Sequence, residues 1–344
     1  MSDAFLEVSH LTKRFGDHVA VGDLSLSVPR GAVLALLGPS GSGKTTTLRL
    51  LAGFERPDTG TIAVDGRDVT ALPPVQRRFG MVFQHYALFP HLTVGENVAF
   101  GLAGQGTRAD RDARVTEMLS LVDLGGFGGR QVGELSGGQQ QRIAVARALA
   151  PEPRVLLLDE PLSNLDPSLR ERTRLEMRAA LDRVGITTVF VTHEQEEAFA
   201  LGDSVAVLNH GRLEQVGTPP ELYEHPRTLF VATFVGRASV LGGVVTGDGR
   251  VRIDAGVECP VDAPQELAAG DRASLVVRPE AVRFAEAGLA GIVTERRYTG
   301  ARALFTVSVS GGRVEIEAPA HAVSVGDPVH LDVERALAFP EVKE

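Results

Sequence analysis

One segment of the chain has the composition of a phosphate-binding loop. Residues 38 to 45 read G-P-S-G-S-G-K-T, a full G-x-x-x-x-G-K-T pattern. Glycines let successive backbone N–H groups turn toward phosphate oxygens, and the N-terminus of a following helix adds positive potential. In such a loop Lys44 would reach the β- and γ-phosphates of ATP, and the Thr45 hydroxyl would bind Mg²⁺. The expected nucleotide contacts are Gly38, Pro39, Ser40, Gly41, Ser42, Gly43, Lys44, Thr45 and Thr46.

The surroundings of this loop favour phosphate binding over the alternative, a purely structural glycine-rich turn. The apolar run Ala32–Leu37 before it predicts a strand buried on both faces, and Lys44–Leu51 after it predicts a helix. Only three of the 35 Lys and Arg residues are lysines, so a generic cation at position 44 would have been arginine. The order of strand, loop and helix therefore predicts a P-loop.

Two carboxylates end a second apolar run. Val155–Leu158 precedes Asp159 and Glu160, and strand carboxyl ends in an α/β sheet converge on the edge where a P-loop lies. Asp159 suits Mg²⁺ through water, and Glu160 suits a general base that polarises the attacking water. The alternative for this pair is a helix cap or a surface acidic patch, which the P-loop upstream makes less favourable.

A third motif, Leu135-Ser136-Gly137-Gly138-Gln139, lies before the acidic pair and opens a helical stretch. Alone it could be a loop and helix cap, but in this order it resembles the signature of the ABC (ATP-binding cassette) ATPases. The resemblance implies that Ser136, Gly137, Gly138 and Gln139 bind ATP held by the P-loop of a second copy. It thus implies a homodimer with two ATP molecules at its interface.

The resemblance extends to single residues whose own signals are weaker. It implies that Phe15 stacks on adenine, although the family more often has Tyr there, and that Gln84 contacts Mg²⁺ and water. His193 would hydrogen-bond the γ-phosphate, and Asp166 in SNLD would lie at the nucleotide site. The structural alternatives are a core aromatic for Phe15, a loop amide for Gln84, an N-cap for Asp166 and a core or capping histidine for His193. The expected catalytic residues are Glu160, His193, Gln84 and Lys44, and the expected Mg²⁺ ligands are Thr45, Gln84 and Asp159.

The segments that must position these residues alternate between strand and helix patterns. The expected fold is an α/β P-loop NTPase with an antiparallel β subdomain, a mostly parallel core sheet and a helical insert. Antiparallel strands are expected at Phe5–Val8, Ser25–Val28 and Thr61–Val64, and parallel strands at Ala32–Leu37, Val155–Leu158 and Thr187–Val191. Crossover and insert helices are expected at Ser168–Val184, Ala109–Val122 and Gln139–Ala150.

The pattern changes near Val235 to short alternating stretches separated by glycine turns, which predicts a small all-β, OB-like barrel domain. We therefore expect a cassette over 1–235 and a β-rich domain over 236–344. The VRPE stretch Val277–Glu280, the Tyr298-Thr299-Gly300 turn and the ending GDPVHLDVERALAF resemble the TOBE domain of importer ATPase subunits. The resemblance implies a regulatory role for this domain.

Composition limits the partners. The 344 residues carry a formal net charge of −9, which provides no general positive field for nucleic acid. Cys259 is the only cysteine, so no internal disulfide can form, and a reducing compartment is expected. The N-terminus lacks the apolar segment of a secretory signal, and the apolar runs fall short of the roughly 20 residues that cross a bilayer.

The resemblance also implies partners. The segment around Gln84–Leu92 would receive the permease, an integral-membrane subunit, although Tyr86, Leu88, Phe89 and Leu92 could equally be core residues. A solute-binding protein would act indirectly, and the chain would lie peripherally on the cytoplasmic face of the inner membrane. The tail resembles subunits that import ferric iron or polyamines such as spermidine and putrescine. Importers of sulfate, molybdate or phosphonate are the alternatives. The alternatives are a soluble ABC ATPase of translation or DNA repair and a P-loop kinase outside the family.

Overall fold

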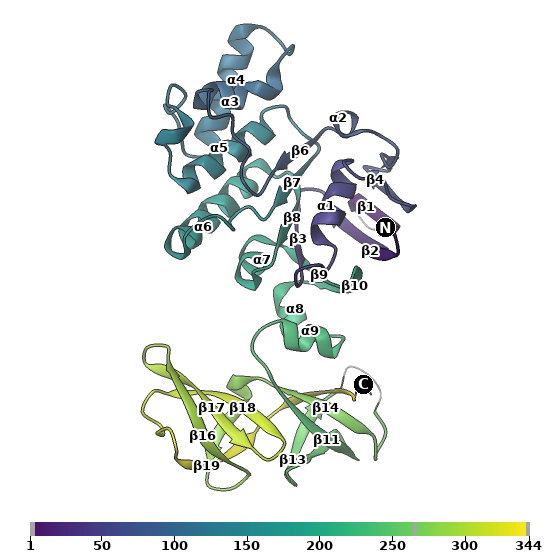
Figure 1. Cartoon of the computed structure of the whole chain (residues 1–344), viewed down its shortest axis with the longest axis vertical. Helices are drawn as coiled ribbons and strands as arrows, with labels where there is room; N and C mark the ends of the chain where they lie inside the picture. The colour runs from purple at the N-terminus through teal and green to yellow at the C-terminus, as the bar shows by residue number, and fades with distance from the viewer. Residues whose placement is uncertain (1–3, 264–266, 342–344) are drawn as a thin grey trace. The chain divides into compact units, whose positions relative to one another are not determined.

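The computed structural model describes residues 4–263 and 267–341, and the chain divides into two compact units, Met1–Pro219 and Pro220–Glu344. Each unit is described here by itself (Figure 1). In the described part of the chain, none of the helices combines the length and the apolar character that crossing a membrane requires.

An antiparallel sheet opens the first unit, in the order β2-β1-β4-β5. Its strands are β1 (Ala4–Phe15), β2 (His18–Pro29), β4 (Thr59–Val64) and β5 (Arg67–Asp68). Buried and exposed residues alternate along the middle of β2, as expected of a sheet with one face on the core. The turn between β1 and β2 pairs Phe15 with His18, which places both side chains on one face of the hairpin.

A six-stranded sheet in the order β10-β9-β3-β8-β7-β6 forms the centre of the unit. Its strands are β3 (Val33–Leu37), β6 (Phe79–Val82), β7 (Val155–Asp159), β8 (Thr187–Thr192), β9 (Ser204–Asn209) and β10 (Arg212–Gly217). All pairings are parallel except β9 with β10. Every residue of β3 and β8 is buried, which explains the continuous apolar run of β3 and the absence of charged residues from β8. The carboxyl ends of β3, β7 and β8 consequently lie at one edge.

The helices of the first unit begin where the sequence offers capping residues. Thr93, Thr107 and Ser136 each form a capping box with the residue three positions later. The helices are α1 (Lys44–Ala52), α2 (Pro74–Arg77), α3 (Val94–Ala99), α4 (Arg108–Leu121), α5 (Gly137–Leu149), α6 (Pro167–Val184) and α7 (Gln195–Leu201), with 3₁₀ turns at Phe100–Leu102 and Val132–Glu134. Helices α3, α4 and α5 gather as a helical insert, across the central strands from β1 and β2 (Figure 1).

A buried arginine fixes the end of α1. Arg77 is 2% exposed and donates from one terminal nitrogen to the carbonyls of Leu50 (2.6 Å) and Leu51 (2.7 Å). These are C-terminal carbonyls of α1 that lack partners within the helix. Burial lowers the pKa of Arg77, which shows how far its guanidinium is withdrawn from water. The far end of the helix that begins at Lys44 is thereby held in place.

The second unit joins two short helices to two β structures. The helices are α8 (Pro219–Glu224) and α9 (Leu229–Phe234). A closed barrel contains β11 (Ser239–Gly247), β12 (Arg250–Ile253), β13 (Glu258–Asp262), β20 (Ala336–Pro340) and β14 (Arg272–Val277). A five-stranded sheet contains β15 (Val282–Ala285), β19 (Pro328–Val333), β16 (Leu289–Tyr298), β17 (Arg302–Val309) and β18 (Gly312–Pro319), and a 3₁₀ turn spans Pro279–Ala281. The barrel was expected; the separate sheet, visible beside it in Figure 1, was not.

Each unit has its own hydrophobic core. One cluster of buried side chains runs from Phe5 to Leu208 within the first unit, and another runs from Leu241 to Ala338 within the second. A smaller cluster packs Ala232 of α9 against Val276 and Phe339 of the barrel. The connector helices α8 and α9 therefore associate with the β-rich unit by contacts, and the domain boundary after Val235 stays a prediction.

We expect a protein of residues 1–219 to fold, bind ATP and unfold cooperatively, because its core is complete without the second unit. A protein of residues 1–235 should also bind ATP but give less soluble product, because α9 would lose its partners Val276 and Phe339. Soluble yield, nucleotide titration and thermal unfolding of both test this. Insoluble protein or failed ATP binding for residues 1–219 would contradict an independent cassette core.

Candidate active site

A cavity of about 390 Å³ lies where the glycine-rich loop meets the end of the central sheet. It brings together residues far apart in the sequence. They are Phe15, His18, Ala20, Ser40, Gly41, Ser42, Gly43, Lys44, Thr45, Thr46, Glu160 and His193. Ten of these were predicted from the sequence; His18 and Ala20 were not.

The loop adopts a shape that requires glycine. Gly41 and Gly43 have φ angles of 79° and 95°, in the region that favours glycine. A Cβ on Gly43 would also lie 2.3 Å from the Ala20 carbonyl oxygen. Residues with side chains would thus be strained or blocked here, and the backbone N–H groups at the start of α1 remain available for an anion.

Lys44 lies at the base of the cavity. It is 6% exposed, and its Nζ donates to the carbonyls of Gly38 (2.8 Å) and Pro39 (2.9 Å). Burial lowers its pKa, and the charge of Glu160 opposes that shift. A buried ammonium held only by neutral oxygens gains most from an anion, so this group fits a nucleotide phosphate.

Glu160 is held in a defined orientation beside the loop. Its φ angle of 44° places a non-glycine residue in the left-handed region, a strained conformation that is frequent at functional sites. Gln84 donates from Nε2 to Glu160 Oε2 over 3.0 Å, and His193 Nδ1 lies 3.4 Å from Oε1. Both carboxylate oxygens therefore have a neighbour, and the carboxylate borders the cavity. This arrangement can take a proton from a water molecule placed there.

Asp159 supplies a second carboxylate at the end of β7. Burial raises its pKa first of all, the charge of Glu160 raises it further, and Arg49 opposes both. A carboxylate that is costly to ionise without a cation fits a divalent metal ion. Oxygens of Asp159, Thr45 and Gln84 are of the type that Mg²⁺ prefers. In the residues described, no three or more His, Cys, Asp or Glu side chains cluster as a metal site.

Phe15 forms one wall of the cavity. It is 47% exposed, which excludes the alternative of a core aromatic, and Lys13 Nζ lies 5.2 Å from its ring centroid. His18 and Ala20 follow on β2 and share its wall. The signal that could have found them is periodicity, since residues 18 and 20 of a strand point to the same face.

The LSGGQ residues lie elsewhere: Ser136, Gly137, Gly138 and Gln139 are not among the described residues that line the cavity. Ser136 caps α5, and its backbone N–H donates to Gln139 Oε1 over 3.0 Å. A Cβ on Gly138 would lie 2.8 Å from Thr173 Oγ1 of α6, so the two helices approach closely there.

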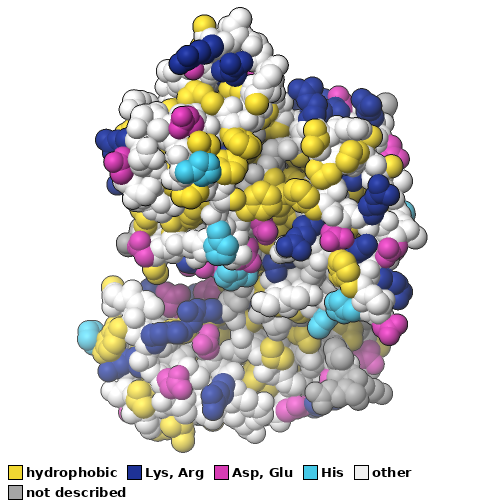
Figure 2. Space-filling model, turned by 45° about the horizontal axis from the view of Figure 1, so that its top comes forward, with side chains coloured by type: hydrophobic (Ala, Val, Ile, Leu, Met, Phe, Trp, Pro, Cys, Tyr) yellow, Lys and Arg dark blue, Asp and Glu magenta, His cyan; other side chains and the backbone are white. Residues whose placement is uncertain are grey.

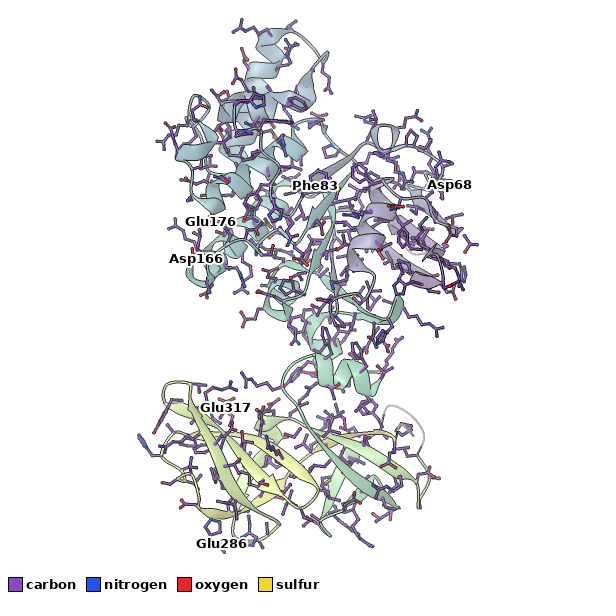
Figure 3. All side chains as sticks on the ribbon, in the orientation of Figure 1. Asp68, Phe83, Asp166, Glu176, Glu286 and Glu317 are labelled. Atoms are coloured by element: carbon purple, nitrogen blue, oxygen red, sulfur yellow. The ribbon has the colours of Figure 1, made fainter. Side chains whose placement is uncertain are left out.

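Asp166 caps α6, as its structural alternative proposed, and accepts the Leu169 N–H over 3.0 Å (Figure 3). Two neighbours that the sequence did not single out connect this segment to Glu160 and to Gln84. Ser163 donates from Oγ to the Glu160 carbonyl over 2.9 Å, and Asn164 donates to the Gln84 carbonyl. Both lie in SNLD, so proximity to Asp166 was the only signal in the sequence.

The segment after Gln84 is held in an unusual conformation. Tyr86 and Ala87 have φ angles of 60° and 49°, and Arg147 of α5 donates to both carbonyls, over 2.8 and 2.7 Å. Tyr86 is buried, as its core alternative proposed, whereas Phe89 is half-buried and its ring centroid lies 4.4 Å from that of Phe100. Leu88 and Leu92 are also half-buried.

Exposed apolar side chains surround this segment. Phe54, Phe83 and Phe100 are 52%, 40% and 56% exposed, and the rings of Phe54 and Phe83 lie 6.2 Å apart. Figure 2 shows hydrophobic side chains gathered on this face of the first unit, and Figure 3 places Phe83 between the helical insert and the antiparallel sheet. Exposed apolar surface of this kind is typical of sites that bind a protein, a membrane or a ligand.

Two family models match the chain. The model described as ABC transporter matches residues 21–163, and the model described as TOBE domain matches residues 275–339. The "Spermidine/putrescine import ATP-binding protein" of Oleidesulfovibrio alaskensis is 49% identical over 287 residues, which cover 82% of this chain and 77% of that protein. The "Fe(3+) ions import ATP-binding protein" of Brucella abortus is 47% identical over 332 residues, covering 94% of this chain and 93% of that protein.

A further relative and a solved structure also belong to ATP-binding proteins of this kind. The "Sulfate/thiosulfate import ATP-binding protein" of Caulobacter vibrioides is 46% identical over 319 residues, covering 91% of this chain and 92% of that protein. The solved dimeric structure of the ATP-binding cassette MJ0796, bound to ADP and Pi in a post-hydrolysis state, is 31% identical with a TM-score of 0.54. It covers 62% of this chain and 98% of that chain. The predicted fold class, a P-loop NTPase followed by a TOBE domain, is confirmed.

We expect Asp159→Asn to stabilise the protein without nucleotide at pH 7, raising Tm by about 2–4 °C. The raised pKa of Asp159 means that ionisation costs more in the folded than in the unfolded state. This cost is absent below the unfolded pKa, grows as the pH rises through the folded pKa and is fully present above it. The gain should therefore vanish near pH 3, and Mg²⁺ should no longer add to stabilisation by ATP.

Thermal unfolding from pH 3 to pH 8, with and without MgATP, measures both effects. Asp17→Asn, at an exposed turn, is the matched control and should leave Tm unchanged. A Tm for Asp159→Asn below that of the unaltered protein at pH 7 would contradict the assignment of an unfavourable buried charge.

Proposed function

The chain belongs to the ABC transporter family of ATP-binding proteins, and on this premise we propose that it hydrolyses ATP to drive a binding-protein-dependent importer. The observation that carries the proposal is the position of Glu160, which borders the phosphate loop while Gln84 and His193 hold its carboxylate. A carboxylate fixed beside an anion site is suited to activate water for attack on a phosphate.

The proposed reaction assigns a role to each side chain. The loop and Lys44 hold the β- and γ-phosphates, and Phe15 stacks on the base. Thr45, Asp159 and Gln84 would hold Mg²⁺ together with water, and the bound ion would supply charge that neutralises the phosphates. Glu160 accepts a proton from the attacking water, and His193 hydrogen-bonds the γ-phosphate oxygen on which charge develops.

We propose that two copies assemble around two ATP molecules, each between the P-loop of one copy and the LSGGQ turn of the other. Support comes from the position of Ser136 to Gln139 outside the cavity of their own chain. The start of α5 offers backbone N–H groups and the Ser136 hydroxyl to a phosphate. The solved structure of MJ0796 is dimeric, which is consistent with this assembly. ATP closes such a dimer, and hydrolysis and product release reopen it.

The proposed partner in the membrane is a permease subunit that docks one of its helices near Gln84–Leu92. The supporting surface is the set of exposed rings of Phe54, Phe83 and Phe100. Gln84 contacts Glu160 at the start of the same segment, so docking and hydrolysis share a residue. A helix packed against this surface would bury these rings, none of which lines the nucleotide cavity.

Localisation and cargo follow from these partners and from the names of the relatives. We place the chain peripherally on the cytoplasmic face of the inner membrane, with a solute-binding protein acting on the permease from the other side. Ferric iron or a polyamine is the proposed cargo, since both occur among the relatives' printed names beside sulfate. The cargo contacts other subunits, so the residues of this chain do not select it.

Glu160→Gln should retain ATP binding but lower kcat by at least about 100-fold, because the amide keeps the shape of the side chain and cannot accept the proton. The variant should also accumulate as an ATP-bound dimer on sizing chromatography with Mg²⁺ and ATP. Glu152→Gln, at a carboxyl group that is 75% exposed and does not line the cavity, is the control. Turnover within about twofold of the unaltered protein would exclude Glu160 as the general base.

Ser136→Arg should block hydrolysis while leaving the nucleotide affinity of the monomer unchanged, because its own P-loop stays intact. Mixing it with Lys44→Ala offers a sharper test. A mixed dimer contains one complete site, formed by the P-loop of the first variant and the LSGGQ turn of the second. Mixing two inactive variants should therefore restore part of the ATPase activity. No recovery in dimers shown to be mixed would rule out a site shared between copies.

A further inference from the structure

The loop that carries His193 is held from one side by a buried carboxyl group. Thr192, the last residue of β8, donates from Oγ1 to Glu197 Oε2 over 2.6 Å. The same hydroxyl accepts the backbone N–H of Glu194 over 3.0 Å. Glu197 is 2% exposed in the first turn of α7. The backbone on both sides of His193 is thereby fixed to the protein interior.

An arginine holds the same loop from the other side. Arg170 of α6 forms an ion pair through one terminal nitrogen with Glu194, the neighbour of His193, and donates from the other to the Leu165 carbonyl over 3.1 Å. The two paired side chains are only 22% and 30% exposed. The planar guanidinium can hold a carboxylate and a carbonyl at once, which a lysine ammonium on its flexible stem does less well. One side chain thus joins the SNLD segment to the loop of His193.

Leu165 extends this connection to the LSGGQ turn. It is 5% exposed, and a Cβ on Gly137 would lie 3.0 Å from its Cδ2 atom. The next residue of the turn, Gly138, lies close to Thr173 of α6. Because the Leu165 side chain packs closely against the LSGGQ turn, a shift of that turn would press on Leu165, whose carbonyl Arg170 holds.

We propose that Arg170 is a positioning residue that couples the LSGGQ turn, through Leu165, to His193, through Glu194. The inference rests on the proposed function, in which the LSGGQ turn binds the partner's ATP and His193 serves the ATP of its own P-loop. Arg170 then links contact of the LSGGQ turn with the partner's ATP to the alignment of His193 at the ATP of its own P-loop. It touches neither nucleotide, so its effect is on turnover rather than on binding.

The chain offers a matched control one helical turn later. Arg174 of α6 pairs with Glu196 of α7, with 3.5 Å between the charged atoms. Glu196 is 86% exposed, so this pair contributes little to stability. This ion pair joins α6 to α7 and does not involve the loop of His193. Its loss therefore controls for the removal of an arginine from α6.

The experiment compares Arg170→Met and Arg174→Met in the full chain by steady-state ATPase kinetics and thermal unfolding. We expect Arg170→Met to lower kcat about tenfold while the KM for ATP changes less than about twofold, within the usual range of coupling between sites. Arg174→Met should keep kcat within about twofold. An Arg170→Met protein with kcat within twofold of the unaltered chain overturns the proposal.

A double-mutant cycle with His193→Ala separates positioning from a general structural role. If Arg170 acts through His193, Arg170→Met should lower the single-turnover rate less than about twofold in the His193→Ala background. Loss of the same factor in both backgrounds overturns the proposal. The single variant His193→Ala tests the proposed function separately. If His193→Ala leaves turnover unchanged, His193 has no role in hydrolysis, and the proposed link from Arg170 to His193 is overturned as well.

Discussion

Parallel pairing of β3 with β8 and of β8 with β7 places three strand ends at one edge of the sheet. The phosphate loop follows β3, the acidic pair ends β7, and His193 follows β8. No local preference of these segments could bring their side chains together, because Lys44 precedes Glu160 by 116 residues and Glu160 precedes His193 by 33. The buried apolar strands and the crossover helix α6 fix the register, and the register fixes the distances among Lys44, Glu160 and His193.

Unfavourable local states are concentrated at this edge. Lys44 is buried, burial raises the pKa of Asp159, and Glu160 adopts a left-handed backbone conformation. Each state costs free energy in the isolated chain, and the surrounding core must offset that cost. Phosphate and Mg²⁺ would relieve the two charge penalties together. The same features that destabilise the site therefore favour nucleotide binding.

The sequence was most informative where function restricts residue types. The glycine-rich loop, the acidic pair and LSGGQ could be recognised because few alternatives satisfy their chemistry, and the buried strands because apolar runs are distinctive. His18, Ser163 and Arg170 could not be found in this way. Their contacts depend on strand register and helix packing, which a single sequence does not determine. The separate sheet of the second unit escaped prediction for the same reason, since alternating strands do not reveal their partners.

The central claim is that the P-loop of one copy and the LSGGQ turn of another form one site. Site-directed cross-linking tests it most directly, because Cys259 is the only cysteine and burial raises its pKa to about 11, leaving it unreactive. Chains carrying Ser40→Cys are mixed with chains carrying Ser136→Cys and oxidised with and without a non-hydrolysable ATP analogue. We expect a nucleotide-dependent disulfide between the two kinds of chain. Two results would contradict the claim. One is a disulfide within a single chain that carries both substitutions, seen at the mass of a monomer. The other is a mixture of the two chains that binds the analogue but does not cross-link.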